Sequence, residues 1–188
     1  MIAHTALAAL AGDYGHGDIV ASHRHEEGQL VYAINGVMLV SVVGTTWVVP
    51  SGHALWVPAG AEHQIRMTGE VRMRTLLISP GAHRALTEEC HVLKVSPLLR
   101  ELIIAAADEH DTEPALLRHV QIVELIFSEL DIAQRVLAHV PIPDEPRLKS
   151  LCAEFIDNPS QESKLESWAV QLNMSCLLYT SDAADERS

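Results

Sequence analysis

The sequence predicts a mainly β N-terminal domain followed by α-helices. Residues 17–79 contain short β-branched and apolar runs separated by Gly and Pro, and after Pro80 the apolar residues take helical spacing. With 48% apolar and 20% charged residues, the 188-residue chain can build a sizeable core, which excludes wholesale disorder. Aromatic residues make up only 4%, so we expect a core built mostly of Val, Leu, Ile and Ala.

The β-rich part is expected to form a closed or two-layered sheet. Its clearest strands cover residues 30–34, 37–40 and 47–49. Asn35 and Gly36 lie between the first two, and both tolerate a positive φ angle, so they predict a hairpin there. Several short strands with frequent turns are typical of an all-β sandwich or barrel.

Two helices are expected next. Ser96 is a suitable N-cap and Pro97 fits a first helical turn, which places the first helix at residues 98–107. The second helix carries an apolar stripe at intervals of three and four residues: Leu116, Val120, Val123, Phe127 and Leu130. The stripe fits either packing on the chain's own sheet or pairing with a second protomer, and Leu117 and Ile126 widen the apolar face enough for both.

A Pro-rich segment, residues 141–146, predicts a domain boundary, because three Pro in six residues cannot continue a helix. We expect a sensor domain at 1–95, a helical dimerisation element at 96–140 and a C-terminal module at 147–175. In that module Ser163 and Glu166 fit a capping box. The helix that follows has one apolar face, formed by Leu165, Trp168, Ala169 and Leu172.

Charge and cysteine content narrow the class of protein. The formal net charge of −12 argues against a protein that coats nucleic acid, since phosphate neutralisation supplies most non-specific affinity. Three Cys do not make a disulfide framework, which favours a reducing compartment. The first ten residues lack the basic start of a signal peptide, and we expect a cytoplasmic protein without membrane spans.

Four residues have the spacing of a metal site. His23 and His25 are two apart, so on a strand their rings face the same side. Gln29 follows at an even spacing, and His63 arrives from a separate strand after a Pro-Gly turn. Neutral imidazoles bind Zn, Fe or Ni, so ligand type alone does not select the metal. The alternatives are an organic ligand among these side chains, or a purely structural role.

These spacings resemble the two motifs of the cupin superfamily. In the first motif, Gly17 precedes the His-x-His pair by five residues, and Gln29 stands where catalytic cupins have a ligating Glu. In the second, Gly52 precedes the Pro-x-Gly turn and His63, and Met67 stands where Asn is usual. The resemblance implies a jelly-roll-like barrel, and the missing carboxylate lowers the expectation of an enzyme.

The helices after the barrel extend the resemblance to the AraC family of bacterial transcription regulators. Residues 48–63 are similar to the effector-domain signature of its cupin-bearing members, and 148–175 to the start of its helix-turn-helix domain, with Asn173 where Gly is usual. The resemblance implies a homodimer that senses a metal ion or small molecule and, as the full-length protein, binds operator DNA.

The same family resemblance suggests which residues contact the effector. The pair His23 and His25, followed by Gln29, Leu30 and Tyr32, is similar to nickel-responsive members. The effector pocket is expected to include three aromatic residues: Tyr32, Trp47 and Trp56.

The C-terminal end does not resemble the recognition helix of that family. Residues 176–186 are acidic and offer no donor that reads guanine in the major groove. The run matches a translation of the transposase adapter used in sequencing libraries, so we interpret 176–188 as adapter read-through on a truncated gene fragment. The fragment alone is then expected not to bind operator DNA.

The alternative function is a metal-dependent cupin enzyme, an oxygenase or isomerase. Such an enzyme needs open metal coordination and a nearby acid or base. Glu62 adjoins His63 but is expected to point away from it, and no other carboxylate has a suitable position. Residues 165–175 favour the regulator, so no catalytic residue is assigned.

Overall fold

The computed structural model describes residues 6–42, 45–83, 87–108, 113–136 and 146–157. The chain divides into two compact units between Pro141 and Ile142, and each is described by itself. The strands of the first unit are β1 (Leu7–Tyr14), β2 (Ile19–His23), β3 (Gly28–Ala33), β4 (Val37–Val42), β5 (Thr45–Pro50), β6 (His53–Val57), β7 (His63–Thr68), β8 (Val71–Ile78), β9 (His91–Lys94) and β10 (Arg135–Val136).

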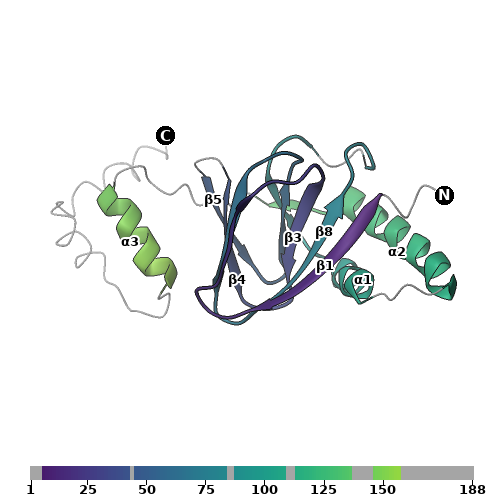
Figure 1. Cartoon of the computed structure of the whole chain (residues 1–188), viewed down its shortest axis with the longest axis horizontal. Helices are drawn as coiled ribbons and strands as arrows, with labels where there is room; N and C mark the ends of the chain where they lie inside the picture. Colours follow the sequence, from purple (N-terminus) through teal and green to yellow (C-terminus); the bar gives the residue numbers. More distant parts are fainter. Residues whose placement is uncertain (1–5, 43–44, 84–86, 109–112, 137–145, 158–188) are drawn as a thin grey trace, which may run out of the picture. The chain divides into compact units, whose positions relative to one another are not determined.

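The strands form two antiparallel sheets. The six-stranded sheet has the order β1-β8-β3-β6-β9-β10, and the four-stranded sheet has the order β2-β7-β4-β5. Helices α1 (Pro97–Ala107) and α2 (Glu113–Ile132) pack on the side of β1, β3 and β8, away from β4 and β5 (Figure 1). The predicted mainly β, cupin-like two-sheet fold followed by helices is confirmed.

Strand β3, inside the six-stranded sheet, is buried on both faces. Along β3, Val31 and Ala33 belong to the core inside the barrel, whereas Leu30 and Tyr32 belong to a second core shared with α1 and α2. This double burial explains the nearly continuous apolar run of β3, because a strand with one solvated face would alternate with polar residues. The two faces therefore have separate roles.

Helix α1 begins as the sequence indicates. The Ser96 hydroxyl accepts a hydrogen bond from the Leu99 backbone N–H at 3.0 Å, and Pro97 occupies the first turn. Four residues of α1 are buried against the sheet and α2: Leu99, Leu102, Ile103 and Ala106. The helix is therefore part of the domain core.

The apolar stripe of α2 contributes to the same core. Val123 and Leu130 are buried, while Val120 and Phe127 are half-buried. The Leu116 side chain lies outside the described part of the structure. Packing on the chain's own sheet thus accounts for Val123 and Leu130, and the pairing of two protomers stays a prediction.

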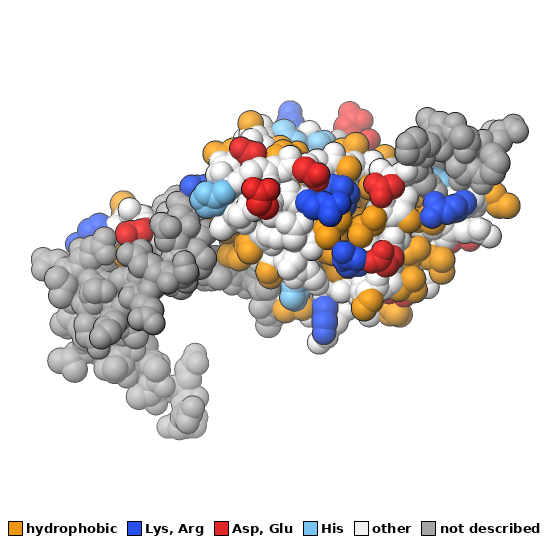
Figure 2. All heavy atoms as spheres, turned by 90° about the horizontal axis from the view of Figure 1, so that it is seen from below, with side chains coloured by type: hydrophobic (Ala, Val, Ile, Leu, Met, Phe, Trp, Pro, Cys, Tyr) orange, Lys and Arg blue, Asp and Glu red, His pale blue; other side chains and the backbone are white. Residues whose placement is uncertain are grey.

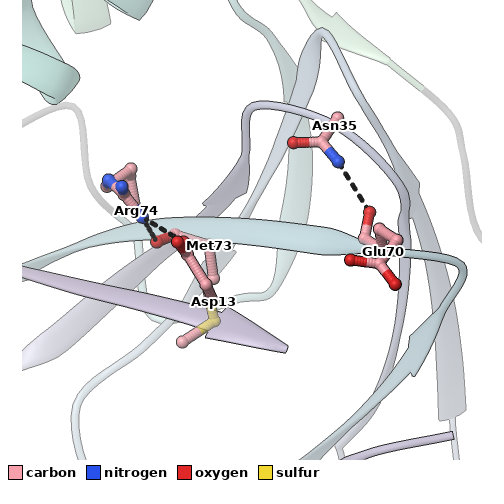
Figure 3. A network of polar contacts seen from close by, with 5 residues as sticks. All are labelled: Asp13, Asn35, Glu70, Met73 and Arg74. Carbon is pink, nitrogen blue, oxygen red and sulfur yellow. Dashed lines mark hydrogen bonds and ion pairs between the residues drawn. The ribbon is translucent and has the colours of Figure 1, made fainter. Parts of the chain in front are cut away.

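The hairpin predicted at Asn35 and Gly36 is wrong. β3 pairs with β6 and β8, whereas β4 pairs with β5 and β7 in the other sheet. Gly36 has a φ of 80°, and a Cβ there would lie 2.6 Å from the Glu70 carbonyl oxygen. The Asn35 amide donates to that oxygen at 2.7 Å (Figure 3). The dipeptide makes a corner at which the chain changes sheets.

An ion pair between the buried Arg74 and the exposed Asp13 joins β8 to the edge strand β1. Arg74 Nη1 donates to Asp13 Oδ1 at 3.0 Å and to the Met73 carbonyl oxygen at 2.8 Å (Figure 3). Arg74 is buried, so the paired carboxylate and carbonyl offset part of the cost of removing its charge from water.

The second unit contains α3 (Pro146–Asp157), of which Leu151 is buried. The predicted helix-turn-helix residues Leu165, Trp168, Ala169 and Leu172, and the tail at 176–188, lie outside the described residues. Within the described ranges, no helix has the length and apolarity needed to cross a membrane. The predicted domain limits stay predictions.

The surface of the described residues carries charges of both signs. On the face in Figure 2, the Lys and Arg side chains lie scattered among Asp and Glu. The described part of that face therefore has no continuous basic patch of the kind that binds the phosphate backbone of nucleic acid.

Candidate metal centre

The candidate site is built from both sheets. His23, the last residue of β2, lies directly opposite His63, the first residue of β7. His25 follows just beyond the end of β2, and Gln29 comes from β3 in the six-stranded sheet. Residues separated by up to 40 positions are thus brought to one end of the barrel.

The three imidazoles, here called the histidine cluster (His23, His25 and His63), are mutually close. Their ring centroids are 4.4 Å apart for His23 and His63, 4.7 Å for His23 and His25, and 5.5 Å for His25 and His63. One nitrogen from each ring lies within 4.8 Å of the others. Nitrogens bound to one zinc ion at about 2.0–2.1 Å lie about 3.4 Å apart in tetrahedral geometry, so the three rings would have to move slightly closer together to hold a single ion.

Backbone carbonyls orient two of the rings. His23 Nδ1–H donates to the Ala21 carbonyl oxygen at 2.6 Å, and His63 Nδ1–H donates to that of Ala61 at 2.9 Å. A proton fixed on Nδ1 leaves the Nε2 lone pair available, as it is in most metal-bound histidines. His25 Nε2 is buried without a hydrogen-bond partner, so a ligand atom there is unsatisfied.

Gln29 adds an oxygen to the site. Its Oε1 lies 2.7 Å from His63 Nε2, and its Nε2–H donates to Thr75 Oγ1 at 3.0 Å. Thr75 in turn donates to the Leu30 carbonyl oxygen at 3.0 Å. Because the His63 proton is on Nδ1, His63 Nε2 and Gln29 Oε1 are both acceptors and face each other without a proton between them. A cation bound by both atoms would remove this unfavourable contact.

Burial favours the neutral form of His25 and His63. Burial is the main cause that lowers the pKa of His63, and the neighbouring His23 and His25 lower it further, against the raising effect of the Ala61 carbonyl. Burial also lowers the pKa of His25, together with His23, while Glu27 and Gln29 oppose this. Metal binding needs neutral imidazole, so both pKa shifts favour it.

A short turn of residues 58–61, here called the connecting turn, positions the cluster. Gly60, at a φ of 76°, donates its backbone N–H to the His25 carbonyl oxygen at 2.8 Å. Beyond the turn, Glu62 accepts a hydrogen bond from Ser22 at 2.9 Å. Glu62 is exposed and bound to Ser22, so the structure does not make it an acid or base for the cluster.

Sequence reasoning missed Thr75 and the Ala61 carbonyl. Thr75 is 46 residues from Gln29, and no local pattern marks it. The sequence gives only a weak indication of the Ala61 carbonyl, because the turn that contains Pro58 and Gly60 ends just before His63.

The predicted effector-pocket residues are not brought together. Tyr32 and Trp56 lie in the core between the six-stranded sheet and the helices. Trp47 packs against the core inside the barrel. The three side chains do not line one pocket with the histidine cluster.

The fold and the site together define a ligand-binding domain of the cupin type. Residues 9–140 match the family model of the AraC-like ligand binding domain. That match covers more than half of the chain, so the chain belongs to this family.

The chain is also similar to a curated protein, the HTH-type transcriptional regulator NimR of Escherichia coli (strain K12). The two are 30% identical over 167 residues, which is 88% of this chain and 61% of that protein. The chain therefore spans about three fifths of the length of this relative.

Two solved structures illustrate weaker likenesses. One is an RmlC-like cupin from Shewanella frigidimarina, with 21% identity, a TM-score of 0.38, and coverage of 41% of this chain and 69% of that one. The other is Bacillus subtilis oxalate decarboxylase, with 23% identity, a TM-score of 0.37, and coverage of 41% and 22%. At these TM-scores neither likeness bears on function.

Proposed function

We propose that this chain is the sensor part of a transcription regulator whose histidine cluster binds a divalent metal ion as its effector. The observation that carries the proposal is the set of three converging imidazoles, one of which has a buried Nε2 atom without a hydrogen-bond partner. Nickel, zinc and iron all suit imidazole ligands. When bound, the ion would join β2 to β7 and reach Gln29 on β3.

Metal content tests this proposal. The metal-free chain is dialysed against Ni²⁺, Zn²⁺ or Fe²⁺ and analysed by mass spectrometry of the metals. The wild type should retain one ion per chain, and His25→Ala should lose about 100-fold in affinity. His16→Ala, which removes an exposed histidine outside the cluster, is the matched control. A wild type that retains no metal would point to an organic effector.

Binding must act on DNA through a change in conformation. A ligand shifts an equilibrium only by its difference in affinity for the two states. The proposal therefore requires the full-length regulator to bind operator DNA differently with and without metal. A gel shift with the full-length protein, with His25→Ala as the uncoupled variant, measures this difference.

The enzyme alternative has weaker support. Among the described residues, the candidate metal-binding group contains three imidazoles and no carboxylate. Cupin chemistry that needs an acid or base beside the metal would lack that group here. The family match also points to a regulator.

We also propose that the chain forms a homodimer through the face of α2 that does not pack in the core of its own protomer. Leu117, Leu125 and Ile132 are 69%, 47% and 76% exposed on one side of α2. Leu117→Lys combined with Leu125→Lys should convert a dimer to a monomer in light scattering. Glu70→Lys, at an exposed position in the turn between β7 and β8, should leave the mass unchanged.

A further inference from the structure

A cavity lies beside the histidine cluster but outside the barrel interior. It has a volume of about 620 Å³ and is called here the Trp56 pocket. Gly28, Trp56 and Ile78 line it from the helix-facing side of the six-stranded sheet, and the connecting turn forms another wall. This volume falls within the usual range of small-molecule sites, about 300–1,000 Å³.

The lining indicates which ligand the pocket accepts. Trp56 is 4% exposed and its Nε1–H is already bonded to the Thr87 carbonyl oxygen at 2.8 Å, so the indole adds a small, apolar contact surface to the pocket. Pro58 and Pro80 extend this apolar surface, and Glu88 supplies a carboxylate. The lining contains no Lys or Arg within the described residues, so it favours neutral or cationic molecules over anions.

The connecting turn joins this pocket to the metal ligands. Gly60 and Ala61 line the pocket, and the same two residues hold the His25 backbone and the His63 ring through hydrogen bonds of 2.8 Å and 2.9 Å. A molecule that moves the turn therefore moves two of the three imidazoles. Sub-ångström shifts at this point would change a coordination geometry that depends on all three rings.

The opposite wall reaches helix α2. His83 stacks on Phe127 with ring centroids 4.8 Å apart and an interplanar angle of 13°. His83 Nε2 also lies 3.5 Å from Asp131 Oδ2. The pocket thus contacts, through its two walls, both the metal ligands and the helix proposed to pair protomers.

We propose that the Trp56 pocket is a second effector site, for a neutral or cationic small organic molecule with an apolar ring, linked to metal binding through the connecting turn. The linkage rests on the proposed metal centre, whereas the pocket itself does not. Linkage is reciprocal, so the factor by which the organic ligand changes metal affinity must equal the factor by which metal changes affinity for that ligand.

The pocket is tested first on the metal-free full chain. Benzyl alcohol, benzylamine and benzoate serve as neutral, cationic and anionic probes in ligand-observed NMR titrations. The first two should bind, and benzoate should bind at least tenfold more weakly. Ala59→Phe, which fills the pocket from an exposed position, should weaken both probes at least tenfold, whereas the matched Ala8→Phe on β1 should not. Glu88→Gln should weaken benzylamine but not benzyl alcohol.

Linkage is tested by titrating Ni²⁺ by calorimetry with and without saturating benzyl alcohol. At least a threefold change in the Ni²⁺ dissociation constant is expected, with the same factor in the reverse titration and none in Ala59→Phe. Failure of all three probes to bind, or binding that survives Ala59→Phe, overturns the pocket. Binding with no effect on Ni²⁺ overturns the linkage. A wild type that binds probes but no Ni²⁺ overturns the metal centre and the linkage, and leaves the pocket established.

Discussion

The two faces of the six-stranded sheet bury similar apolar side chains but differ in their polar chemistry. The face inside the barrel carries Gln29 and Thr75, which are hydrogen-bonded to each other, and Gln29 Oε1 lies 2.7 Å from His63 Nε2 in the histidine cluster. The face under α1 and α2 carries Leu30 and Tyr32 from the same strand, and the Trp56 pocket at one end. One strand therefore serves a polar site on one side and a helix interface on the other, because successive side chains alternate.

This arrangement gives a signal from the barrel a short path to the helices. The helix-side core is continuous with the barrel wall, so α1 and α2 are not an appended element. A change at the histidine cluster needs to cross only one sheet, or follow the connecting turn, to reach α2. Substitutions on each side of the sheet would show how far the two faces are independent.

The helix-side core should be as important for stability as the barrel interior. Ile126 on α2 is fully buried, and Ile126→Ala should lower the free energy of unfolding by about 2–5 kcal/mol. Ile65→Ala inside the barrel should cost a similar amount. Urea unfolding followed by circular dichroism measures both.

The shape of the transition separates the alternatives. If the two faces form one cooperative unit, Ile126→Ala should unfold in a single step with a lower midpoint. Two separate steps would show that the helices unfold independently of the barrel. Leu98→Ala, at an exposed position of helix α1, should change the free energy by less than about 0.5 kcal/mol.

Gly28 should tolerate no side chain on the helix-facing side of β3. A Cβ there would lie 2.1 Å from Trp56 Cη2, and Trp56 is held by its bond to Thr87. Gly28→Ala should therefore cost about 1–3 kcal/mol in urea unfolding.

A double-mutant cycle assigns the cause of that cost. Gly28→Ala with Trp56→Leu should lose less than the sum of the two single variants, because the smaller side chain removes the clash. Additive costs would contradict the assigned contact. Gly15→Ala is the matched control, since its nearest neighbour would be 3.7 Å from the new Cβ.

The barrel-side face should respond to charge at Gln29. Gln29→Glu places a carboxylate beside His63, so the affinity for Ni²⁺ in calorimetry should rise about tenfold or more. The metal-free variant should be less stable than the wild type, because a buried carboxylate loses its hydration. Gln64→Glu, at an exposed position on β7, should change neither quantity. Unchanged affinity in Gln29→Glu would remove Gln29 from the metal site.

The sequence was informative where spacing alone decides the geometry. His23, His25 and His63 were predicted to converge, and they do: His23 pairs with His63 across β2 and β7, and Gly60 holds the His25 backbone just beyond the end of β2. By the same alternation, Tyr32 is three residues from Gln29 and lies on the opposite face of β3. A pocket that contains both Tyr32 and the metal ligands is therefore inconsistent with the strand pattern itself.

Other features depend on contacts that no local pattern encodes. Asn35 and Gly36 have the chemistry of a hairpin turn, but the corner they form is decided by the backbone of Glu70. Thr75 becomes part of the site only because β3 and β8 pair in a register that sets it beside Val31. Long-range register of this kind is set by the packing of whole strands.

Acid sensitivity is the smallest expected effect and draws on both faces. Burial lowers the pKa of His25 and His63 at the barrel end and of His91, which lies opposite Trp56 on the helix side. In the unfolded chain these groups titrate near the ordinary value of 6.5. The unfolded state therefore takes up protons first as the pH falls.

The stability of the metal-free protein should be constant above about pH 7 and should decline as the pH falls through 6.5. Urea midpoints between pH 8 and pH 5 measure this decline. His91→Gln should make it shallower by removing the helix-side group. If the urea midpoint of His91→Gln falls with pH as steeply as that of the wild type, the acid sensitivity comes from the barrel-side histidines alone. The two faces would then differ in proton binding as well as in their polar side chains.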